Sequence, residues 1–412
     1  MPEKHIIIVA GEASGDLHAA HLVQELKHLD PSLTFSGLGG IKMKEAGVEI
    51  YQDLTRIAVV GFSEVIKHYR EFKKAFDLIV DKVTEIKPGA VILVDYPGFN
   101  LRLAKILKEK FNTRIIYYIS PQVWAWKQKR IRKIKKYVDK MLVIFNFEKD
   151  FYARIGMKAD FVGHPLLDSI KISISKEQFL ISHGLANNKL TIGLLPGSRE
   201  KEVKTLLPIM LEAAQILAKK IATIQFLVVK APTIQTSLIN KFLKKMSFSL
   251  TVIEEQNYDA MNACDLCMVA SGTATLETAI LQKPMVVVYK TSLLTWLLAK
   301  LFVKIPDIGL VNVVAGKRIV PECIQFQATG SQIAVELKNI FTNEIRMADI
   351  KSNLRSVRES LGEAGASQAA ARKIYQTIVN QKDYSPQYQK IMKKLHYVSP
   401  GKKFSREELN ES

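Results

Sequence analysis

The feature that most constrains the fold is the alternation of short apolar runs with amphipathic helical patterns. The run HIIIVA at residues 5–10 precedes an amphipathic pattern at 16–29, and AVILVD at 90–95 precedes another at 100–111. Similar apolar, β-branched runs occur at residues 114–120, 140–145, 190–196, 223–230, 250–254, 266–271 and 284–289. This alternation is typical of βαβ units, in which helices join parallel strands. The sequence therefore predicts an α/β fold with doubly wound parallel sheets.

The length and one pause in this pattern predict two domains. The chain has 412 residues, which is too long for one ordinary hydrophobic core. The alternation stops near residues 165–188 and then resumes. We therefore expect one Rossmann-like domain over residues 1–175 and a second over 176–345. Helices are expected over 346–381, and the polar, lysine-rich residues 382–412 are expected to form a loosely held tail.

The composition narrows the cellular setting and the partners. A formal net charge of +19 predicts attraction to an anion, such as nucleic acid, a phospholipid surface or a phosphorylated substrate. Three cysteines are too few for a disulfide framework and fit a reducing compartment. The first apolar run is too short for a signal peptide, and the apolar stretch at 293–303 is interrupted by Lys300. These features predict a cytoplasmic protein.

Two strand ends in the first half carry candidate ligand groups, because open α/β sheets bind ligands beyond the carboxyl ends of their strands. Small residues at 11–15 follow the first strand, and their backbone N–H groups at a helix start would attract an anion. Helix capping by Ser14 or Asp16 explains this loop equally well. Asp95 follows the strand at 90–94 and could accept a proton from a substrate hydroxyl. Hydrogen bonding of Asp95 to turn amides is the simpler explanation from these residues alone.

The stretch LLPGSREKEV at 194–203 is the strongest anion site in the second half. Gly197 allows close approach of a ligand to the backbone, and Ser198 is expected to cap a helix that begins at Arg199. The Arg199 guanidinium offers a fork of donors to phosphate oxygens. An arginine opposes the helix dipole at this position, so we expect an anion to neutralise it.

A second loop in the same domain has matching chemistry. Ser271, Gly272 and Thr273 follow the strand at 266–270, and Glu277 lies four residues beyond Thr273, on the same helix face. The loop could hold a diphosphate and the carboxylate a ribose diol, although an N-capped helix explains either loop singly. Two such loops in one domain favour a nucleotide diphosphate. The sequence contains no Asp-x-Asp pair, which argues against a metal-clamped nucleotide sugar; no metal and no cofactor are expected.

Together these motifs resemble those of the bacterial lipid-A-disaccharide synthases. The shared motifs, in order, are GEASGD, DYPGFN, SPQVWAWKQKR, VGHP, LLPGSREKEV, SGTATLE and VPECIQ, from about residue 11 to 325. The later stretch GEAGASQAAARKIYQTIV also fits, whereas the tail beyond residue 381 has no counterpart. The resemblance implies a GT-B type glycosyltransferase fold. In that fold two Rossmann-like, doubly wound domains face a cleft, and a C-terminal helix crosses back to the N-terminal domain.

The resemblance also implies a reaction. The enzyme would be an inverting, metal-independent glycosyltransferase that uses UDP-2,3-diacylglucosamine and 2,3-diacylglucosamine 1-phosphate (lipid X). It would form the β-1,6-linked disaccharide 1-phosphate and UDP in lipid A biosynthesis. Asp95 matches the family's D-x-P-x-F-N pattern, so the resemblance makes it the base. Gly197, Ser198, Arg199 and the 271–273 loop would bind UDP and neutralise the diphosphate charge, and Glu277 would hold the ribose.

Further residues match family motifs without a firm role. They are expected to contact the acceptor or the donor sugar, and the motifs do not separate these two possibilities. The residues are Glu12, Ser14, Gly15, Asp16, Asn312, Glu322 and Gln325.

Two other functions remain open. The tryptophans and basic residues of 124–137 would suit a nucleic-acid-binding protein, although a solvated lysine-rich face explains them too. An epimerase or hydrolase on the same fold would use UDP-GlcNAc without lipid. The resemblance favours the glycosyltransferase and implies no nucleic-acid partner.

Acylated substrates imply contact with the anionic cytoplasmic face of the inner membrane. Residues 57–80 are expected to form an amphipathic helix whose apolar stripe rests partly in the interface and packs partly on the sheet. Its apolar residues are Phe62, Val65, Ile66, Tyr69, Phe72 and Phe76, and its basic residues are Lys67, Arg70, Lys73 and Lys74. The apolar stretch at 293–304 would give a further membrane contact or the surface of a homodimer.

Overall fold

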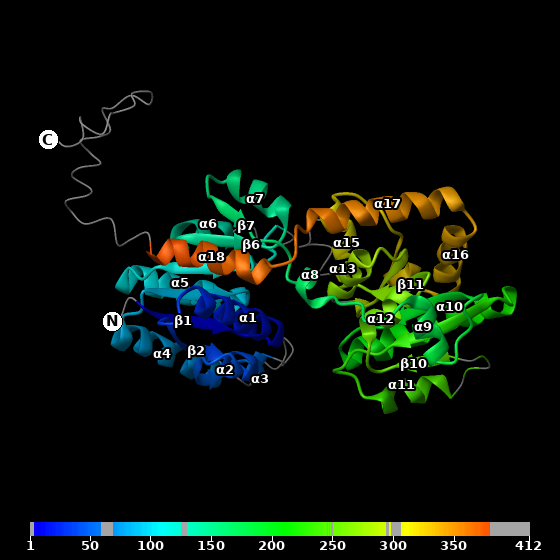
Figure 1. Ribbon diagram of the computed structural model, residues 1–412, viewed down its shortest axis with the longest axis horizontal. Helices are drawn as coiled ribbons and strands as arrows, with labels where there is room; N and C mark the ends of the chain where they lie inside the picture. The colour runs from blue at the N-terminus through cyan, green and yellow to red at the C-terminus, as the bar shows by residue number, and fades with distance from the viewer. Residues whose placement is uncertain are drawn as a thin grey trace, which may run out of the picture. The chain divides into compact units, whose positions relative to one another are not determined.

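The structure is a computed structural model that describes residues 4–58, 69–124, 130–244, 246, 248, 250–293, 296–297 and 306–379 (Figure 1). The described residues form two compact units. One contains residues from 1–93, 106–116 and 368–379, and the other contains residues from 94–105 and 117–367. The domain boundaries expected at residues 175 and 345 stay predictions.

The first sheet has seven strands in the order β3-β2-β1-β4-β5-β6-β7. The pairs β1–β2, β2–β3 and β6–β7 are parallel. The strand order reverses between β1 and β4, which makes this the switch point of a doubly wound sheet. The strands are β1 (His5–Ala10), β2 (Thr34–Gly39), β3 (Glu49–Asp53), β4 (Ala90–Val94), β5 (Ile115–Tyr118), β6 (Lys140–Val143) and β7 (Ala159–Phe161).

The second sheet has six strands in the order β10-β9-β8-β11-β12-β13, and all of its neighbouring pairs are parallel. Its switch point lies between β8 and β11. The strands are β8 (Leu190–Leu195), β9 (Ile224–Val229), β10 (Leu250–Ile253), β11 (Leu266–Ala270), β12 (Met285–Tyr289) and β13 (Glu322–Ile324).

Helices connect the strands in both units (Figure 1). Those up to the second sheet are α1 (Ala13–Leu29), α2 (Ile41–Glu45), α3 (Thr55–Ala58), α4 (Tyr69–Ile86), α5 (Pro97–Phe111), α6 (Arg130–Tyr137), α7 (Asn146–Ala153), α8 (Leu166–Ser169) and α9 (Lys176–Ser182). The later ones are α10 (Glu200–Lys220), α11 (Thr236–Leu243), α12 (Asn257–Ala263), α13 (Thr273–Ile280), α15 (Leu310–Ala315), the 3₁₀ turn η2 (Gln325–Gln327), α16 (Gly330–Phe341), α17 (Glu344–Ser360) and α18 (Ala366–Val379).

The central strands are buried on both faces, which explains their unbroken apolar sequences. Every residue of β4 and β11 is buried, as is every residue of β1 after its first. The predicted strands that contain these runs are confirmed. Strand β2, with the sequence TFSGLG, was not predicted because its glycines break the apolar pattern. Gly37 lies so close to β1 that a Cβ there would come within 1.8 Å of the Ile8 carbonyl oxygen.

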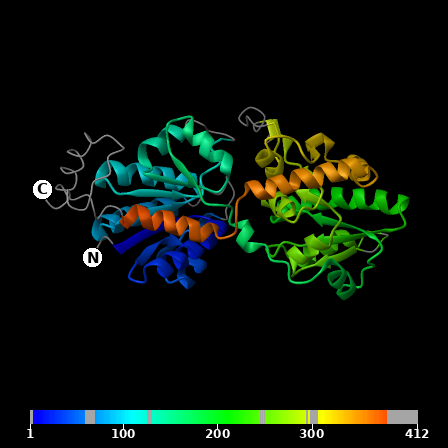
Figure 2. The ribbon, with the colours of Figure 1, turned by 45° about the horizontal axis from the view of Figure 1, so that its top comes forward.

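The expected return of the C-terminal helix to the first unit is confirmed. Helix α17 packs on α13, α15 and α16 of the second unit, whereas α18 belongs to the unit that contains β1 to β3. The Arg114 guanidinium donates a hydrogen bond to the Thr377 carbonyl oxygen of α18 at 2.8 Å. Figure 2 shows α18 beside the first sheet.

Only part of the expected membrane helix lies within the described residues. Phe62, Val65, Ile66 and Lys67 lie outside them, as do most of 293–304 and the tail 382–412. The described part of this helix is α4. Its buried side chains are Ala75 and Ile79, and its half-buried ones are Phe72 and Phe76. Its exposed basic side chains are Arg70, Lys73 and Lys74. No helix in the described ranges has both the length and the apolar character needed to cross a membrane.

Candidate functional site

The sequence-predicted loops lie at the two switch points, where ligands bind in doubly wound sheets. Residues 196–199 follow β8 and residues 271–272 follow β11, and these strands are neighbours. In the first sheet, the loop that begins at Gly11 follows β1, and Asp95 follows β4, again on neighbouring strands. Each sheet therefore brings together two of the four predicted strand ends.

The loop after β8 differs in one respect from the expectation. Helix α10 begins at Glu200 with Arg199 at the N-cap position, and no side chain caps it. The expectation that Ser198 caps a helix beginning at Arg199 is therefore wrong. The Ser198 backbone N–H instead donates to Oε2 of Glu202 at 3.3 Å, so a carboxylate from the first turn reaches back to the loop. Gly197 has φ of 112°, a left-handed conformation that favours glycine.

The carboxylate of Glu202 also binds Arg199. The guanidinium Nη1 donates to Oε1 at 3.0 Å, while the Arg199 side chain is 80% exposed. An external anion was expected to offset the positive charge of an arginine at the helix start. The chain supplies such a group itself, so the arginine alone does not require a ligand.

The loop after β11 has its backbone exposed to an open cavity. Gly272 occupies the N-cap position of α13 with φ of 153°, and a Cβ there would meet no atom within 4 Å. The Ser271 hydroxyl donates to the Ile308 carbonyl oxygen at 3.0 Å, which fixes the loop against the segment before α15. Thr273 is exposed at the first position of α13. The N-terminal amides of α13 therefore face a space that a ligand can enter.

Both loops line one cavity of about 1260 Å³, which Glu277 also lines. Burial raises the pKa of Glu277, and among the described residues its carboxylate has no hydrogen bond or ion pair. The neighbouring Tyr258 has its pKa raised to about 12, mainly by burial and further by the charge of Glu277. A carboxylate in such a setting is suited to accept hydrogen bonds from the hydroxyls of a polar ligand.

The segments that follow β9 and β10 supply cavity residues that were not predicted from the sequence. Lys230 is buried; its ammonium group donates to the Ile234 carbonyl oxygen at 2.9 Å and lies 3.8 Å from Glu254. Asn257 donates to the Lys230 carbonyl oxygen, and its Oδ1 is a buried acceptor without a hydrogen-bond partner among the described residues. The signal for Lys230 was present, because this lysine ends the predicted strand at 223–230.

Asn312 and Glu322 form a buried support for the segment before α15. The Glu322 carboxylate accepts hydrogen bonds from the backbone N–H groups of Ile308 and Gly309 and from the Asn312 amide, at 2.8 to 3.1 Å. The Asn312 oxygen accepts from the backbone of residues 319–320. Ile308 in turn accepts from Ser271, so these side chains help to position the loop after β11. Their direct contact with a sugar stays a prediction.

Gln325 is also committed to the backbone. Its amide exchanges two hydrogen bonds with the main chain of Thr291, and its φ of 53° is unusual for a residue other than glycine. It is buried just after β13 and stabilises the turn that follows β12. Its role toward a sugar likewise stays a prediction.

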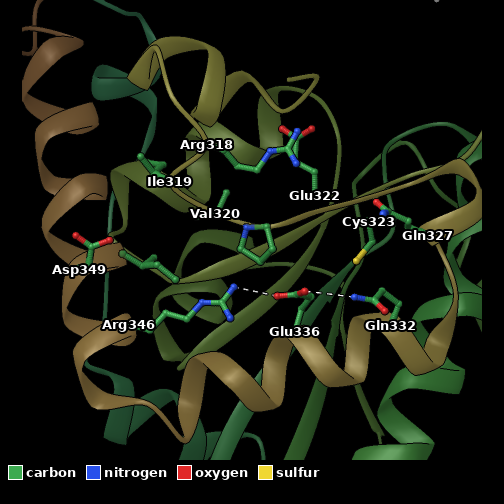
Figure 3. A pocket seen from close by; sticks show the side chains of 12 residues that line it. Arg318, Ile319, Val320, Glu322, Cys323, Gln327, Gln332, Glu336, Arg346 and Asp349 are labelled. Atoms are coloured by element: carbon green, nitrogen blue, oxygen red, sulfur yellow. Dashed lines mark hydrogen bonds and ion pairs between the residues drawn. The ribbon is translucent and has the colours of Figure 1, made fainter. Parts of the chain in front are cut away.

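A second cavity of about 430 Å³ lies beside the edge strand β13 (Figure 3). Most of its charged groups already bind other protein groups. Arg346 binds Glu336 at 2.9 Å, Glu336 also accepts from Gln332, and Arg318 binds Asp307 at 2.7 Å. We therefore interpret the side chains that line this cavity as a polar network that stabilises the packing of α16 and α17 on the edge strand.

In the first sheet, the loop after β1 has one residue with a clear structural task. The Asp16 carboxylate is buried and accepts hydrogen bonds from the backbone N–H groups of Gly40, Lys42 and Met43 at 2.7 to 3.1 Å. It thereby binds the N-terminus of α2 and not that of its own helix. Gly15 is buried as well, whereas Glu12 and Ser14 are exposed and can face a ligand.

Asp95 is held in a strained backbone at the end of β4. Asp95 and Tyr96 have φ of 44° and 45°, a left-handed conformation that few non-glycine residues adopt. The Asp95 carbonyl oxygen accepts hydrogen bonds from the Asn100 amide and the Tyr117 hydroxyl, which fix this turn. Burial raises the pKa of Tyr117, and the charge of Asp95 adds to that shift. The half-buried Asp95 carboxylate is thus presented by a rigid turn beyond the sheet edge.

The segments that follow β5 and β6 contain a buried carboxylate that was not predicted from the sequence. Glu148 is fully buried and accepts hydrogen bonds from the Trp124 indole N–H at 3.1 Å and the Phe145 backbone N–H at 3.2 Å. Burial raises its pKa to about 8. Next to it, Ser120 and Tyr152 share a hydrogen bond. This cluster fixes the first tryptophan of the VWAW motif; the second, Trp126, lies outside the described residues.

Two doubly wound parallel sheets are the architecture of GT-B type glycosyltransferases, and in this chain the second sheet carries two loops that line one large cavity. The family described as Lipid-A-disaccharide synthetase matches residues 6–377. A lipid-A-disaccharide synthase of Geobacter metallireducens is 41% identical over 370 residues, which cover 90% of this chain and 96% of that protein. One from Trichlorobacter lovleyi is 43% identical over 368 residues, covering 89% and 96%. The chain belongs to the lipid-A-disaccharide synthetase family.

Solved structures show the same fold at low sequence identity. UDP-GlcNAc 2-epimerase from Neisseria meningitidis, bound to UDP-GlcNAc, has a TM-score of 0.60 at 15% identity and covers 90% of this chain and 100% of its own. MurG from Acinetobacter baumannii has a TM-score of 0.58 at 13% identity, covering 90% and 99%. An epimerase and MurG therefore share the architecture, and the family match separates this chain from the epimerases.

Proposed function

We propose that the chain transfers 2,3-diacylglucosamine from UDP-2,3-diacylglucosamine to 2,3-diacylglucosamine 1-phosphate (lipid X). The products are the β-1,6-linked lipid A disaccharide 1-phosphate and UDP. The observation that carries this proposal is the family match over residues 6–377, with relatives of that name aligned over about nine-tenths of the chain. The large cavity at the second switch point is consistent with a UDP-sugar donor.

In this proposal the second sheet binds UDP. The amides after β11 and the Arg199 guanidinium neutralise the diphosphate, whose charge grows as the glycosidic bond breaks. Glu277 accepts hydrogen bonds from the ribose hydroxyls. Its position in the cavity supports this role, as does a carboxylate that no described residue engages. This arrangement stabilises the leaving group with protein groups, so we expect no requirement for a divalent metal.

Asp95 acts as the general base. The acceptor 6-oxygen attacks the anomeric carbon as the bond from that carbon to the UDP oxygen breaks, and the hydroxyl proton passes to the Asp95 carboxylate. A single displacement of this kind inverts the anomeric configuration. The strained turn after β4 supports the assignment, because strain of this kind collects at functional sites.

Contacts to the sugars are proposed for the exposed members of the predicted set. Glu12 and Ser14 are exposed after β1, on the strand that neighbours β4 and its Asp95. Asp16, Asn312, Glu322 and Gln325 make buried hydrogen bonds within the protein, so we assign them to positioning of the binding loops.

Thin-layer chromatography of reactions with both acylated substrates tests the function. We expect a disaccharide 1-phosphate and stoichiometric UDP only when both substrates are present. A parallel reaction with UDP-GlcNAc alone tests the epimerase and hydrolase alternatives. Conversion of UDP-GlcNAc without disaccharide formation from the acylated pair would contradict the proposal.

We further propose that the protein acts at the anionic cytoplasmic face of the inner membrane, where its acylated substrates reside. The net charge of +19 supports an anionic surface, and the three cysteines, all buried free thiols, fit a reducing compartment. Leu293, Leu297 and Phe326 have exposed apolar side chains, and Phe326 packs edge to face with Trp296. These side chains offer an apolar contact that complements the charge; pairing of two copies is the alternative use of this surface.

Vesicle co-sedimentation over a salt series tests the membrane proposal. Each basic residue near an anionic leaflet contributes about 1 kcal/mol, and salt screens it over a Debye length of about 10 Å. We expect binding to acidic vesicles that falls steeply with salt and leaves a residual apolar component. Absence of binding at low salt, or full displacement by duplex DNA, would favour the nucleic-acid alternative. Light scattering of the lipid-free protein identifies a homodimer.

A further inference from the structure

The donors assigned to the diphosphate after β8 are engaged by a group of the protein itself. Ser198 N–H and the Arg199 guanidinium both donate to the Glu202 carboxylate, at 3.3 and 3.0 Å. Gly197 is in van der Waals range of the same side chain, since a Cβ there would lie 2.6 Å from Oε2. All four residues line the cavity of about 1260 Å³. A carboxylate thus stands where the proposed function places a phosphate oxygen.

We infer that Glu202 is an internal competitor of the nucleotide diphosphate, which displaces it from Ser198 and Arg199 on binding. The inference rests on the proposed function and adds a residue that tunes nucleotide affinity. One N–H cannot donate at full strength to two anions, and a carboxylate beside a diphosphate adds repulsion between like charges.

The loop can release Glu202 without losing its own shape. The Glu202 side chain is 33% exposed, so it can turn into solvent. The Ser198 carbonyl oxygen accepts a hydrogen bond from the Thr233 hydroxyl at 2.6 Å, which fixes the loop from the β9 side. Arg199, at 80% exposed, has further N–H donors in its fork to follow the incoming phosphate.

Calorimetric titration with UDP tests the inference in wild type, Glu202→Gln and Glu202→Ala. An exposed ion pair contributes about 0.2–1 kcal/mol, so we expect both variants to bind UDP about 1.4- to fivefold more tightly than wild type. Glu200→Gln is the matched control. It removes the same charge from the same helical turn, but Glu200 pairs with Lys204 at 2.8 Å and touches neither loop donor. Its UDP affinity should match that of wild type.

Repeating the Glu202 substitutions in an Arg199→Ala variant shows whether Glu202 changes UDP affinity through Arg199. The gain from Glu202→Gln should shrink there, because one of the two contested donors is gone. Equal or weaker UDP binding by both Glu202 variants, with wild-type thermal unfolding, would overturn the inference and make Glu202 a support for Arg199. Equal gains in Glu200→Gln and Glu202→Gln would also overturn it, since they would indicate a general charge effect. Absence of UDP binding in wild type would instead contradict the proposed function.

Discussion

At the residue scale, Asp95 combines a reactive carboxylate with a backbone conformation that is unfavourable for most side chains. The Asn100 and Tyr117 hydrogen bonds to its carbonyl oxygen stabilise that conformation. A substitution at this position must therefore preserve the turn if it is to report on chemistry alone.

Asp95→Asn meets that condition, because asparagine tolerates positive φ and has nearly the same shape. It cannot accept the acceptor's proton, so we expect turnover to fall by about 10²–10⁴-fold. UDP binding should persist, since Asp95 does not line the cavity assigned to UDP. Steady-state kinetics and UDP calorimetry on the folded variant give the two readings. Near-normal turnover would show that Asp95 is not the base.

Glu277 and Arg199 should affect binding as well as rate. Loss of a hydrogen bond to a charged group costs about 1.5–3 kcal/mol, so Glu277→Ala and Arg199→Ala should each weaken UDP binding by about tenfold or more. Glu277→Gln keeps an acceptor oxygen and should lose less than the alanine variant. UDP calorimetry measures all three. Unchanged affinity in Glu277→Ala would place the ribose elsewhere in the cavity.

At the scale of secondary-structure elements, single buried carboxylates join neighbouring helices and loops. Asp16 on α1 holds the N-terminus of α2, and Glu322 holds the N-terminus of α15. In both cases the helix amides bind to a residue distant in sequence, which sequence-local capping rules do not anticipate.

Asp16→Asn should destabilise the protein and leave UDP binding intact. The amide NH₂ would face one of the three N–H donors that now meet a carboxylate oxygen, and a buried donor left without an acceptor costs about 1–3 kcal/mol. Urea unfolding measures the loss, and UDP calorimetry under native conditions is the control. A stable variant with impaired acceptor binding would instead assign Asp16 to the sugar site.

Glu148 should make stability depend on pH. Its pKa of about 8 in the folded protein lies above the ordinary value of 4.5, so the folded state retains a proton that the unfolded state has lost. Glu148 therefore makes its full contribution to the free energy of unfolding below about pH 4.5. As the pH rises to about 8 this contribution is lost, and the free energy of unfolding falls by at most about 5 kcal/mol. Urea unfolding from pH 4.5 to 9 should show this fall relative to Glu148→Gln, which does not titrate. Parallel curves for the two proteins would contradict it.

At the scale of the whole molecule, the chemistry assigned to the two sheets is complementary. The first presents the Asp95 carboxylate, which we propose as the base, at its switch point, and the second presents cationic and amide donors at its own. The excess of positive charge over the whole chain suits a reaction in which donor and acceptor both carry phosphate.

This arrangement predicts catalysis without a divalent metal. Disaccharide formation should survive exhaustive chelation, because Arg199 and the loop amides supply the charge stabilisation of the leaving UDP. The assay is product formation after treatment with chelator, followed by addition of magnesium or manganese. Loss of activity that either metal restores would refute this prediction.

Most of the architecture followed from the sequence alone because buried parallel strands require long apolar runs. The runs at 5–10, 90–95, 190–196 and 266–271 became central strands, and their ends located the four loops. The reaction was predicted from the motifs shared with the lipid-A-disaccharide synthases. Strand β2 was missed because its glycines serve close packing against β1, which leaves no apolar periodicity.

The partners of the polar side chains were decided by the tertiary structure. Three candidate sugar-binding residues, Asn312, Glu322 and Gln325, were recognisable as motif members, yet their side chains bind the protein's own loops. Glu202 looked like an ordinary acidic residue in a first helical turn, whereas in the fold it binds both Ser198 and Arg199. Periodicity reports which face of an element is buried. The acceptor that a given N–H finds depends on how distant segments pack, and only the folded chain determines that.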